Sequence, residues 1–220
     1  MRKVLLANNE IYHVLNKSIA KYKVFNNESD YLRMVNMLRY YTIQKPLMRF
    51  SQFNKLSSNE QKIFIIKNYT SNTQYLIDIL SYNIMPTHIH LALKQLSDNG
   101  ISNYVKNILI SYSRYFNTKY KRKGPLWEGR FKNVHVNDEY QLLHLTRYIH
   151  LNAVSAGLVE KPEDWLASSY NEYISKVPKQ DMICKFGGLI NIKPEIYRKF
   201  VENRIAYQRQ LSRIKKLILE

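Results

Sequence analysis

The chain has 220 residues, and its 34 lysines and arginines outnumber its 17 aspartates and glutamates, which gives a formal net charge of +17. This length suits one well-buried core with an appendage, while a charge that exceeds the needs of solubility indicates a polyanionic partner, foremost a nucleic acid. Because the sequence has neither an apolar run of about 18 residues nor a signal-peptide pattern, we expect a soluble, intracellular protein without a membrane partner.

The N-terminal half is predicted to alternate strands with a helix. A short apolar, β-branched run over 11–15 predicts a first strand. Apolar residues at three- and four-residue steps over 31–41 predict an amphipathic helix. Residues 47–72 allow either a strand or a helix. Two runs rich in β-branched and aromatic residues, 74–84 and 88–94, flank a proline-containing turn and predict a hairpin.

The C-terminal half is predicted to be mainly helical. Apolar residues spaced along one face predict a helix over 101–120. A strand is expected over 130–136, and a capped helix over 139–154. A basic helical tail is expected over 194–219. This order of elements predicts an α+β fold, with a small antiparallel sheet and helices on its faces.

His88 and His90 are the first candidate functional residues. Side chains at i and i+2 of a strand point to the same face, so this pair can hold one divalent metal. The single cysteine, Cys184, excludes an internal disulfide and a cysteine-rich zinc ribbon, so a metal would need histidine, carboxylate or amide ligands. Two histidines at this spacing also occur by chance or as a solvent-facing pair.

Tyr148 and Asn152 form the second candidate pair. They are spaced i and i+4 on the helix after the last strand, so their side chains lie one above the other. An amide oxygen is a hard ligand suited to Mg²⁺ or Mn²⁺, and a phenol one turn away would lie next to whatever that metal binds. The alternative is that Tyr148 is a packing or surface residue, as most of the 18 tyrosines must be, and that Asn152 is a polar residue near a helix end.

A basic stretch with an interleaved aromatic residue follows the helix over 101–120. Such a stretch suits phosphate contacts combined with base stacking on single-stranded or hairpin DNA. The alternative is a solvated helix end with the tryptophan in the core. The predicted DNA-binding residues are Lys119, Lys121, Arg122, Lys123, Trp127, Arg130 and Lys132.

The remaining histidines, His13, His135, His144 and His150, are interpreted as surface groups or as satisfied core groups. His144 lies one turn before Tyr148 on the same stripe of the helix, where it is placed to hydrogen-bond the phenol.

Several short motifs occur in a fixed order along residues 10–175. They are Tyr12-His13-Val14, Asp30-Tyr31, Met85-Pro86-Thr87-His88-Ile89-His90-Leu91, Tyr112-Ser113-Arg114-Tyr115-Phe116-Asn117, Gly124-Pro125-Leu126-Trp127-Glu128-Gly129-Arg130-Phe131 and Arg147-Tyr148-Ile149-His150-Leu151-Asn152-Ala153-Val154. In this order the chain resembles the REP-associated tyrosine transposases, which belong with the single-tyrosine, IS200-like transposases of the HUH type. No single motif is specific, but the ordered set is.

The resemblance implies a fold and a set of residue roles. The fold would be a ferredoxin-like, RRM-like antiparallel sheet with the histidines at its centre. His88, His90 and Asn152 would bind Mg²⁺ or Mn²⁺, and Tyr148 would be the nucleophile. The catalytic domain would cover 1–175, followed by a basic helical C-terminal extension over 176–220.

The same resemblance implies an activity. The protein would cleave and rejoin single-stranded, hairpin-associated DNA by transesterification through a 5′-phosphotyrosine, in the bacterial cytoplasm and at the nucleoid. The oligomeric state, monomer or homodimer, stays open. Two alternatives differ in class: a domesticated DNA-binding protein of the same fold without net transposition activity, and a metal-dependent hydrolase in which Tyr148 only positions water.

Three positions depart from the family's pattern. Thr87 stands where asparagine is usual, Lys17 where arginine is common after the first strand, and Ala153 where proline is frequent. None is an expected metal ligand or the expected nucleophile, so these departures bear on substrate detail.

Overall fold

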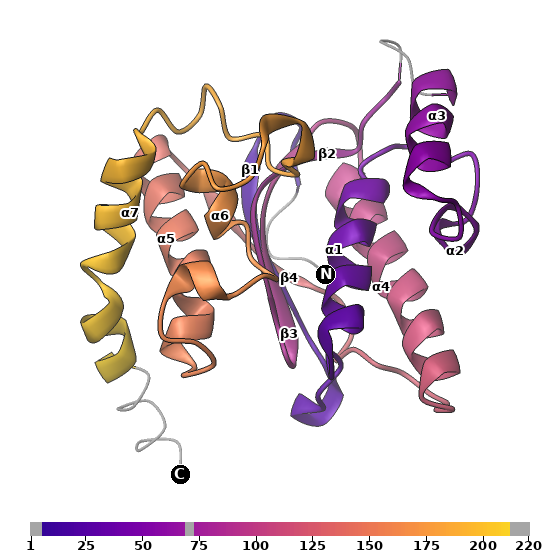
Figure 1. Cartoon of the computed structure of the whole chain (residues 1–220), viewed down its shortest axis with the longest axis horizontal. Coiled ribbons are helices and arrows are strands. Elements are labelled where there is room, and N and C mark those ends of the chain that lie inside the picture. Colours follow the sequence, from indigo (N-terminus) through magenta and orange to yellow (C-terminus); the bar gives the residue numbers. More distant parts are fainter. Residues whose placement is uncertain (1–5, 69–72, 212–220) are drawn as a thin grey trace.

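The computed structural model describes residues 6–68 and 73–211, and is organised around a four-stranded antiparallel sheet with the strand order β2-β3-β1-β4 (Figure 1). The strands are β1 (Ile11–Lys17), β2 (Ile77–Met85), β3 (His88–Gln95) and β4 (Lys132–Val136). With α1 (Glu28–Tyr40) after β1 and α4 (Gly100–Lys119) after β3, the chain follows the β-α-β-β-α-β order of a ferredoxin-like fold. The predicted α+β, ferredoxin-like class is confirmed.

Helices cover both faces of the sheet. α1 and α4 lie on one face, with α2 (Phe50–Phe53) and α3 (Ser58–Asn68) beyond them (Figure 1). The opposite face carries α5 (Glu139–Ser155), α6 (Tyr170–Tyr173) and α7 (Pro194–Glu202). Three short 3-10 turns complete the elements: Ile19–Lys21, Pro162–Asp164 and Lys179–Asp181. Within the described ranges, no helix is both long and apolar enough to span a bilayer.

The alternation of side chains along the two central strands separates two cores. Tyr12 and Val14 of β1, together with Ile89 and Leu91 of β3, are buried in the core beneath α1 and α4. Ala92 of β3 belongs to the second core, beneath α5 and α7. Odd-numbered residues of β1 and even-numbered residues of β3 therefore face α5, and this includes the two histidines of the predicted metal pair.

The expected elements match the observed ones within a few residues, while α6 and the three 3-10 turns were not expected. The segment over 47–72 contains the helices α2 and α3, and its last residues, 69–72, lie outside the described residues. The basic tail expected over 194–219 begins as α7, turns at residues 203 and 204, and is helical again over 205–211, and its remainder is not described.

The C-terminal extension packs against the rest of the chain. Cys184 joins the first core, and Ile190, Tyr197 and Val201 are buried in the second. Leu142, Ile149 and Leu151 of α5 are buried in the same second core. The extension thus adds a layer over α5, and the division of the chain at residue 175 stays a prediction.

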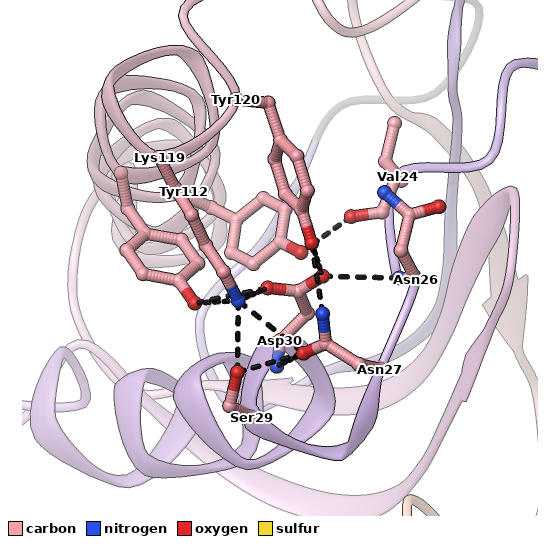
Figure 2. Close-up of polar contacts among 9 residues, drawn as sticks. Val24, Asn26, Asn27, Ser29, Asp30, Tyr112, Lys119 and Tyr120 are labelled. Carbon is pink, nitrogen blue, oxygen red and sulfur yellow. Dashed lines mark hydrogen bonds and ion pairs between the residues drawn. The ribbon is translucent and has the colours of Figure 1, made fainter.

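A buried carboxylate joins the start of α1 to the end of α4 (Figure 2). The Asp30 side chain is fully buried and accepts hydrogen bonds from Lys119 Nζ at 2.7 Å, the Tyr120 hydroxyl at 2.6 Å and the Tyr115 hydroxyl at 2.9 Å. The backbone N–H of Asn26 donates a fourth at 3.0 Å. Burial raises the pKa of this carboxyl, but the four hydrogen bonds outweigh burial and leave the pKa below its ordinary value.

Asp30→Asn should lower the free energy of unfolding at neutral pH by about 3 kcal/mol, the lower end for a broken buried pair, because Lys119 keeps some contact with solvent. Since the folded-state pKa lies below the unfolded one, this stabilisation is present above the unfolded pKa and is lost as the pH falls through the folded pKa. Urea unfolding followed by circular dichroism at neutral and acidic pH measures both effects. Asp164→Asn, an exposed control, should change stability little, and equal midpoints for the two variants would contradict the role of Asp30.

Candidate active site

A cleft of about 330 Å³ lies between the sheet and α5, at the end of the sheet where β1 ends and β3 begins. It brings together the four residues expected to carry the chemistry, His88, His90, Tyr148 and Asn152. Its other lining residues are Leu15, Lys17, Ser18, Lys21, Thr87 and Glu128. Residues from a central strand pair, a loop and a helix thus meet in one hollow.

The register of β1 on β3 positions the histidine pair. His88 lies opposite Lys17, and His90 opposite Leu15, with both imidazoles on the face covered by α5. Each ring is held through its Nδ1 atom: His88 Nδ1 lies 3.0 Å from Thr87 Oγ1, and His90 Nδ1 lies 3.0 Å from His13 Nε2. Within the described part of the chain, no protein group holds Nε2 of either ring, so both Nε2 atoms are available as ligands.

His13 is a part of the site that the sequence did not reveal. Its ring stacks on His90 with 5.2 Å between centroids and 12° between planes, and its edge meets Tyr148 at 6.0 Å. A histidine that holds the far nitrogen of a metal ligand fixes the orientation and tautomer of that ligand. The sequence did place His13 in one of the ordered motifs, but the strand register that brings His13 to His90 could not be read from the chain.

All three imidazoles are neutral at pH 7. Burial lowers the pKa of His13 to about 4, and burial with the nearby Lys17 lowers the pKa of His88 to about 4. The pKa of His90 is lowered well below its ordinary value, by burial first and then by its neighbours His88, His13 and Lys17. A neutral imidazole is the form that binds a metal.

Tyr148 and Asn152 enter the cleft from α5. The Tyr148 side chain is 43% exposed, and its ring lies edge-on to His90 with 5.6 Å between centroids. Burial raises the pKa of the phenol, so Tyr148 is protonated in the free protein. Asn152 donates its amide N–H to the Tyr148 carbonyl oxygen at 3.0 Å, which leaves its side-chain oxygen as the acceptor.

These donors fit a divalent cation. Two imidazole nitrogens and one amide oxygen are neutral ligands of intermediate and hard character, and three protein ligands leave coordination positions for phosphate oxygens or water. Within the described residues, no cluster of three histidine, cysteine or carboxylate side chains is placed to hold a metal. The amide oxygen of Asn152 is a further neutral donor in the same cleft.

Of the seven residues predicted to contact DNA, Lys119, Trp127 and Arg130 line two adjoining cavities along α4. Trp127 and Arg130 line a cavity over α4, and the Trp127 indole also donates to Ser113 Oγ at 3.0 Å. Lys119 is held by the buried carboxylate at the start of α1, and the Arg122 guanidinium donates to carbonyl oxygens of its own loop. The other three side chains are exposed: Lys121, Lys123 and Lys132.

His144 is not bonded to the phenol of Tyr148. Its Nδ1 lies 2.8 Å from an Arg147 nitrogen, and its ring packs on Tyr140 with 4.3 Å between centroids. The interpretation of His150 as a satisfied core group is confirmed, because the ring is fully buried and both of its nitrogens have hydrogen-bond partners.

The ferredoxin-like sheet carries a His-x-His pair on a central strand, and this pair faces a helix that carries a tyrosine and an amide one turn apart. Residues 34–152 match the family described as transposase, IS200 like, which is more than half of the chain. The chain belongs to the IS200-like transposase family.

One curated protein and one solved structure are similar to this chain. A protein of Haemophilus influenzae described as a REP-associated tyrosine transposase is 34% identical over 110 residues, which are 44% of this chain and 61% of that protein's own length. A solved structure of a REP-associated tyrosine transposase bound to a REP hairpin covers 87% of this chain and 94% of that one, with 13% identity and a TM-score of 0.53. The structural likeness supports the ferredoxin-like fold.

His13→Ala should weaken Mn²⁺ binding by about tenfold or more, because His90 loses the partner that orients it. Isothermal titration with Mn²⁺ in the absence of DNA measures this effect, and the thermal midpoint of the metal-free protein reports on any damage to the fold. His13→Gln, which keeps a hydrogen-bonding group, should recover part of the affinity. The control is His135→Ala, which removes a histidine bound to Glu10 at the other end of the sheet. Equal affinities for His13→Ala and the control would contradict the positioning role.

Proposed function

We propose that this chain is a metal-dependent transposase that cleaves and rejoins single-stranded, hairpin-associated DNA through a 5′-phosphotyrosine. The observation that carries the proposal is the meeting of Tyr148 with two uncommitted imidazole nitrogens in one open cleft. A binding protein of the same fold has no use for this set of side chains. A hydrolase in which Tyr148 only positions water would leave no protein covalently attached to DNA.

The reaction follows from the position of the phenol. The Tyr148 oxygen attacks the phosphorus, a tyrosyl O–P bond forms, and the bond from phosphorus to the 3′ oxygen breaks. The phenolic proton leaves through solvent, and the 3′ oxygen takes up a proton in its place. Attack by another 3′-OH on the phosphotyrosine reverses these steps and joins two strands, so no external energy source is required.

The side chains around Tyr148 support this chemistry. Because burial raises the pKa of the phenol, the phenolate needs positive charge nearby. Lys17 and Lys21 line the same cleft and supply part of it. His88, His90 and Asn152 would hold Mg²⁺ or Mn²⁺, and a bound divalent cation reduces the charge on the scissile phosphate and favours the departing 3′ oxygen.

Two further observations support DNA as the substrate. The net charge of +17 provides the attraction that phosphates need. The REP-associated tyrosine transposase whose fold resembles this chain was solved bound to a REP hairpin. We infer that the strand to be cleaved lies in the cleft, with hairpin DNA next to it.

The wild-type chain should form a denaturation-resistant adduct with the 5′ phosphate of a cleaved single strand, and Tyr148→Phe should form none while it still binds DNA and Mn²⁺. Loss of one hydroxyl leaves the packing almost unchanged, so the effect is chemical. Labelled oligonucleotides carrying hairpins, analysed on denaturing gels, measure the adduct.

Tyr140→Phe is the matched control, because Tyr140 lies on the same helix but is 73% exposed and packs on His144, outside the cleft. It should keep its activity. Cleavage by the wild type without any protein–DNA adduct would instead indicate a hydrolase, and an adduct mapped to another tyrosine would overturn the role of Tyr148.

His88→Ala and His90→Ala should each abolish cleavage and leave DNA binding nearly intact, since phosphate contacts come from basic residues elsewhere. Cleavage assays with Mg²⁺, Mn²⁺ and EDTA, run beside binding assays, separate the two effects. Full cleavage by either variant in EDTA would contradict the assignment of the histidines as metal ligands.

A further inference from the structure

We propose that the outer face of α4 binds a single-stranded segment of the DNA that extends from the cleavage position. We call this surface the α4 trough. It is formed by two adjoining cavities of about 1030 and 620 Å³. Ile110, Arg114 and Thr118 line both, and their i, i+4, i+8 spacing places them on one ridge of the helix.

The α4 trough carries more basic side chains than nearby carboxylates neutralise. Neither cavity is lined by an aspartate or a glutamate. Of its basic residues, Lys119 alone pairs with a carboxylate among the described residues, the buried Asp30. The basic residues of the α4 trough are Arg33, Arg49, Lys106, Arg114, Lys119 and Arg130. This charge pattern fits a polyanion.

The floor of the α4 trough is apolar and aromatic. Leu109, Trp127 and Phe131 line the larger cavity, and Ile110, between the two cavities, is 43% exposed. In the smaller cavity, the Arg33 guanidinium lies over aromatic rings, 4.5 Å from the Phe50 centroid and 4.9 Å from the Tyr115 centroid, and its buried Nε has no hydrogen-bond partner. A flat cation packed on rings offers a platform for stacking.

The apolar floor and the basic rim of the α4 trough together favour single-stranded over double-stranded DNA. A duplex presents its phosphates on the outside and keeps its base faces stacked inside, so it has nothing to bury against an apolar floor. An unpaired strand presents both phosphates and base faces, and sites for single strands combine a positively charged groove with aromatic stacking surfaces. The α4 trough therefore suits an unpaired strand better than a hairpin stem.

The loop between α4 and β4 connects the α4 trough with the cleft. Glu128 lines the cleft, whereas its neighbours Trp127, Gly129 and Arg130 line the larger cavity of the α4 trough. Gly129 has a φ of +129°, a conformation that strains any residue with a side chain, and it allows the loop to present successive residues to opposite sides. A strand that leaves the cleft at Glu128 reaches the α4 trough at Gly129.

The test uses the full chain in EDTA, so that binding is measured without cleavage. Fluorescence anisotropy with a labelled thymidine oligonucleotide gives the slope of log K against log salt. Lys106→Ala/Arg114→Ala should reduce this slope by about 0.7 for each phosphate that the protein no longer neutralises. The matched control is Lys193→Ala/Lys199→Ala, which removes the same charge from exposed positions at α7, on the opposite side of the sheet (Figure 1). It should leave the slope unchanged.

Two results would overturn the proposal. Equal reductions of the slope in the two double variants would show that only the net charge matters, and a blunt duplex that competes as well as the unlabelled single strand would show that the occupant is not an unpaired strand. The circular dichroism spectrum and thermal midpoint of each variant confirm that the fold is retained.

The proposal takes DNA as the ligand from the proposed function, yet the two fail separately. A wild-type chain that forms the Tyr148 adduct, but whose binding does not depend on Lys106 and Arg114, refutes the α4 trough alone. A chain whose binding depends on these two residues, but which forms no adduct, refutes the tyrosine chemistry alone.

Discussion

The antiparallel pairing of β1 with β3 is the constraint on which the other features of this protein depend. Because side chains alternate along each strand, this register sends Tyr12 and Val14 into one core and places His13 diagonally across from His90 on the other face. A slip of one residue would exchange the two faces of β1 and bury Lys17 in an apolar core. The same pairing thus holds the fold together and orients the candidate metal ligands.

The two faces of the sheet differ in the side chains that they bury. On the face of α1 and α4, apolar residues pack into one core, and the buried carboxylate of Asp30 accepts four hydrogen bonds. On the face of α5, the core is interrupted at the end of the sheet, where imidazoles, a lysine and a half-buried phenol replace aliphatic side chains. Neutral imidazoles tolerate this partly dry position, whereas charged ones would not.

Periodicity in the sequence was enough to predict local relations. The i, i+2 spacing of His88 and His90 and the i, i+4 spacing of Tyr148 and Asn152 each depend only on the local backbone, and the structure places all four residues in one cleft. Periodicity could not predict which residues from distant segments of the chain come together. His13 lies 77 residues from His90, so its place in the site depends on strand register.

For the predicted DNA-binding residues too, the sequence does not reveal contacts with distant or neighbouring groups. Lys119 looks like a free cation in the sequence, but its partner Asp30 is 89 residues away. Arg122 also looks available, yet it is bonded to carbonyl oxygens of its own loop. Conversely, Arg33 and Arg114 belong to separate helices, and no pattern along the chain indicates that they line one cavity. Composition predicts a polyanionic partner, and the fold shows which basic side chains are already bonded within the protein.

Buried hydrogen bonds hold α5 in place and thereby fix the position of the Tyr148 phenol. His150 of α5 is bonded to the Tyr197 hydroxyl at 2.6 Å and to Ser169 Oγ at 2.8 Å, and Asn83 of β2 donates to the Ile149 carbonyl oxygen at 2.7 Å. A helix tied to the sheet and to α7 cannot swing toward a neighbouring molecule without breaking buried hydrogen bonds. In the reaction proposed above, Tyr148 would therefore attack DNA that is bound by its own chain, at an effective concentration set by the fold.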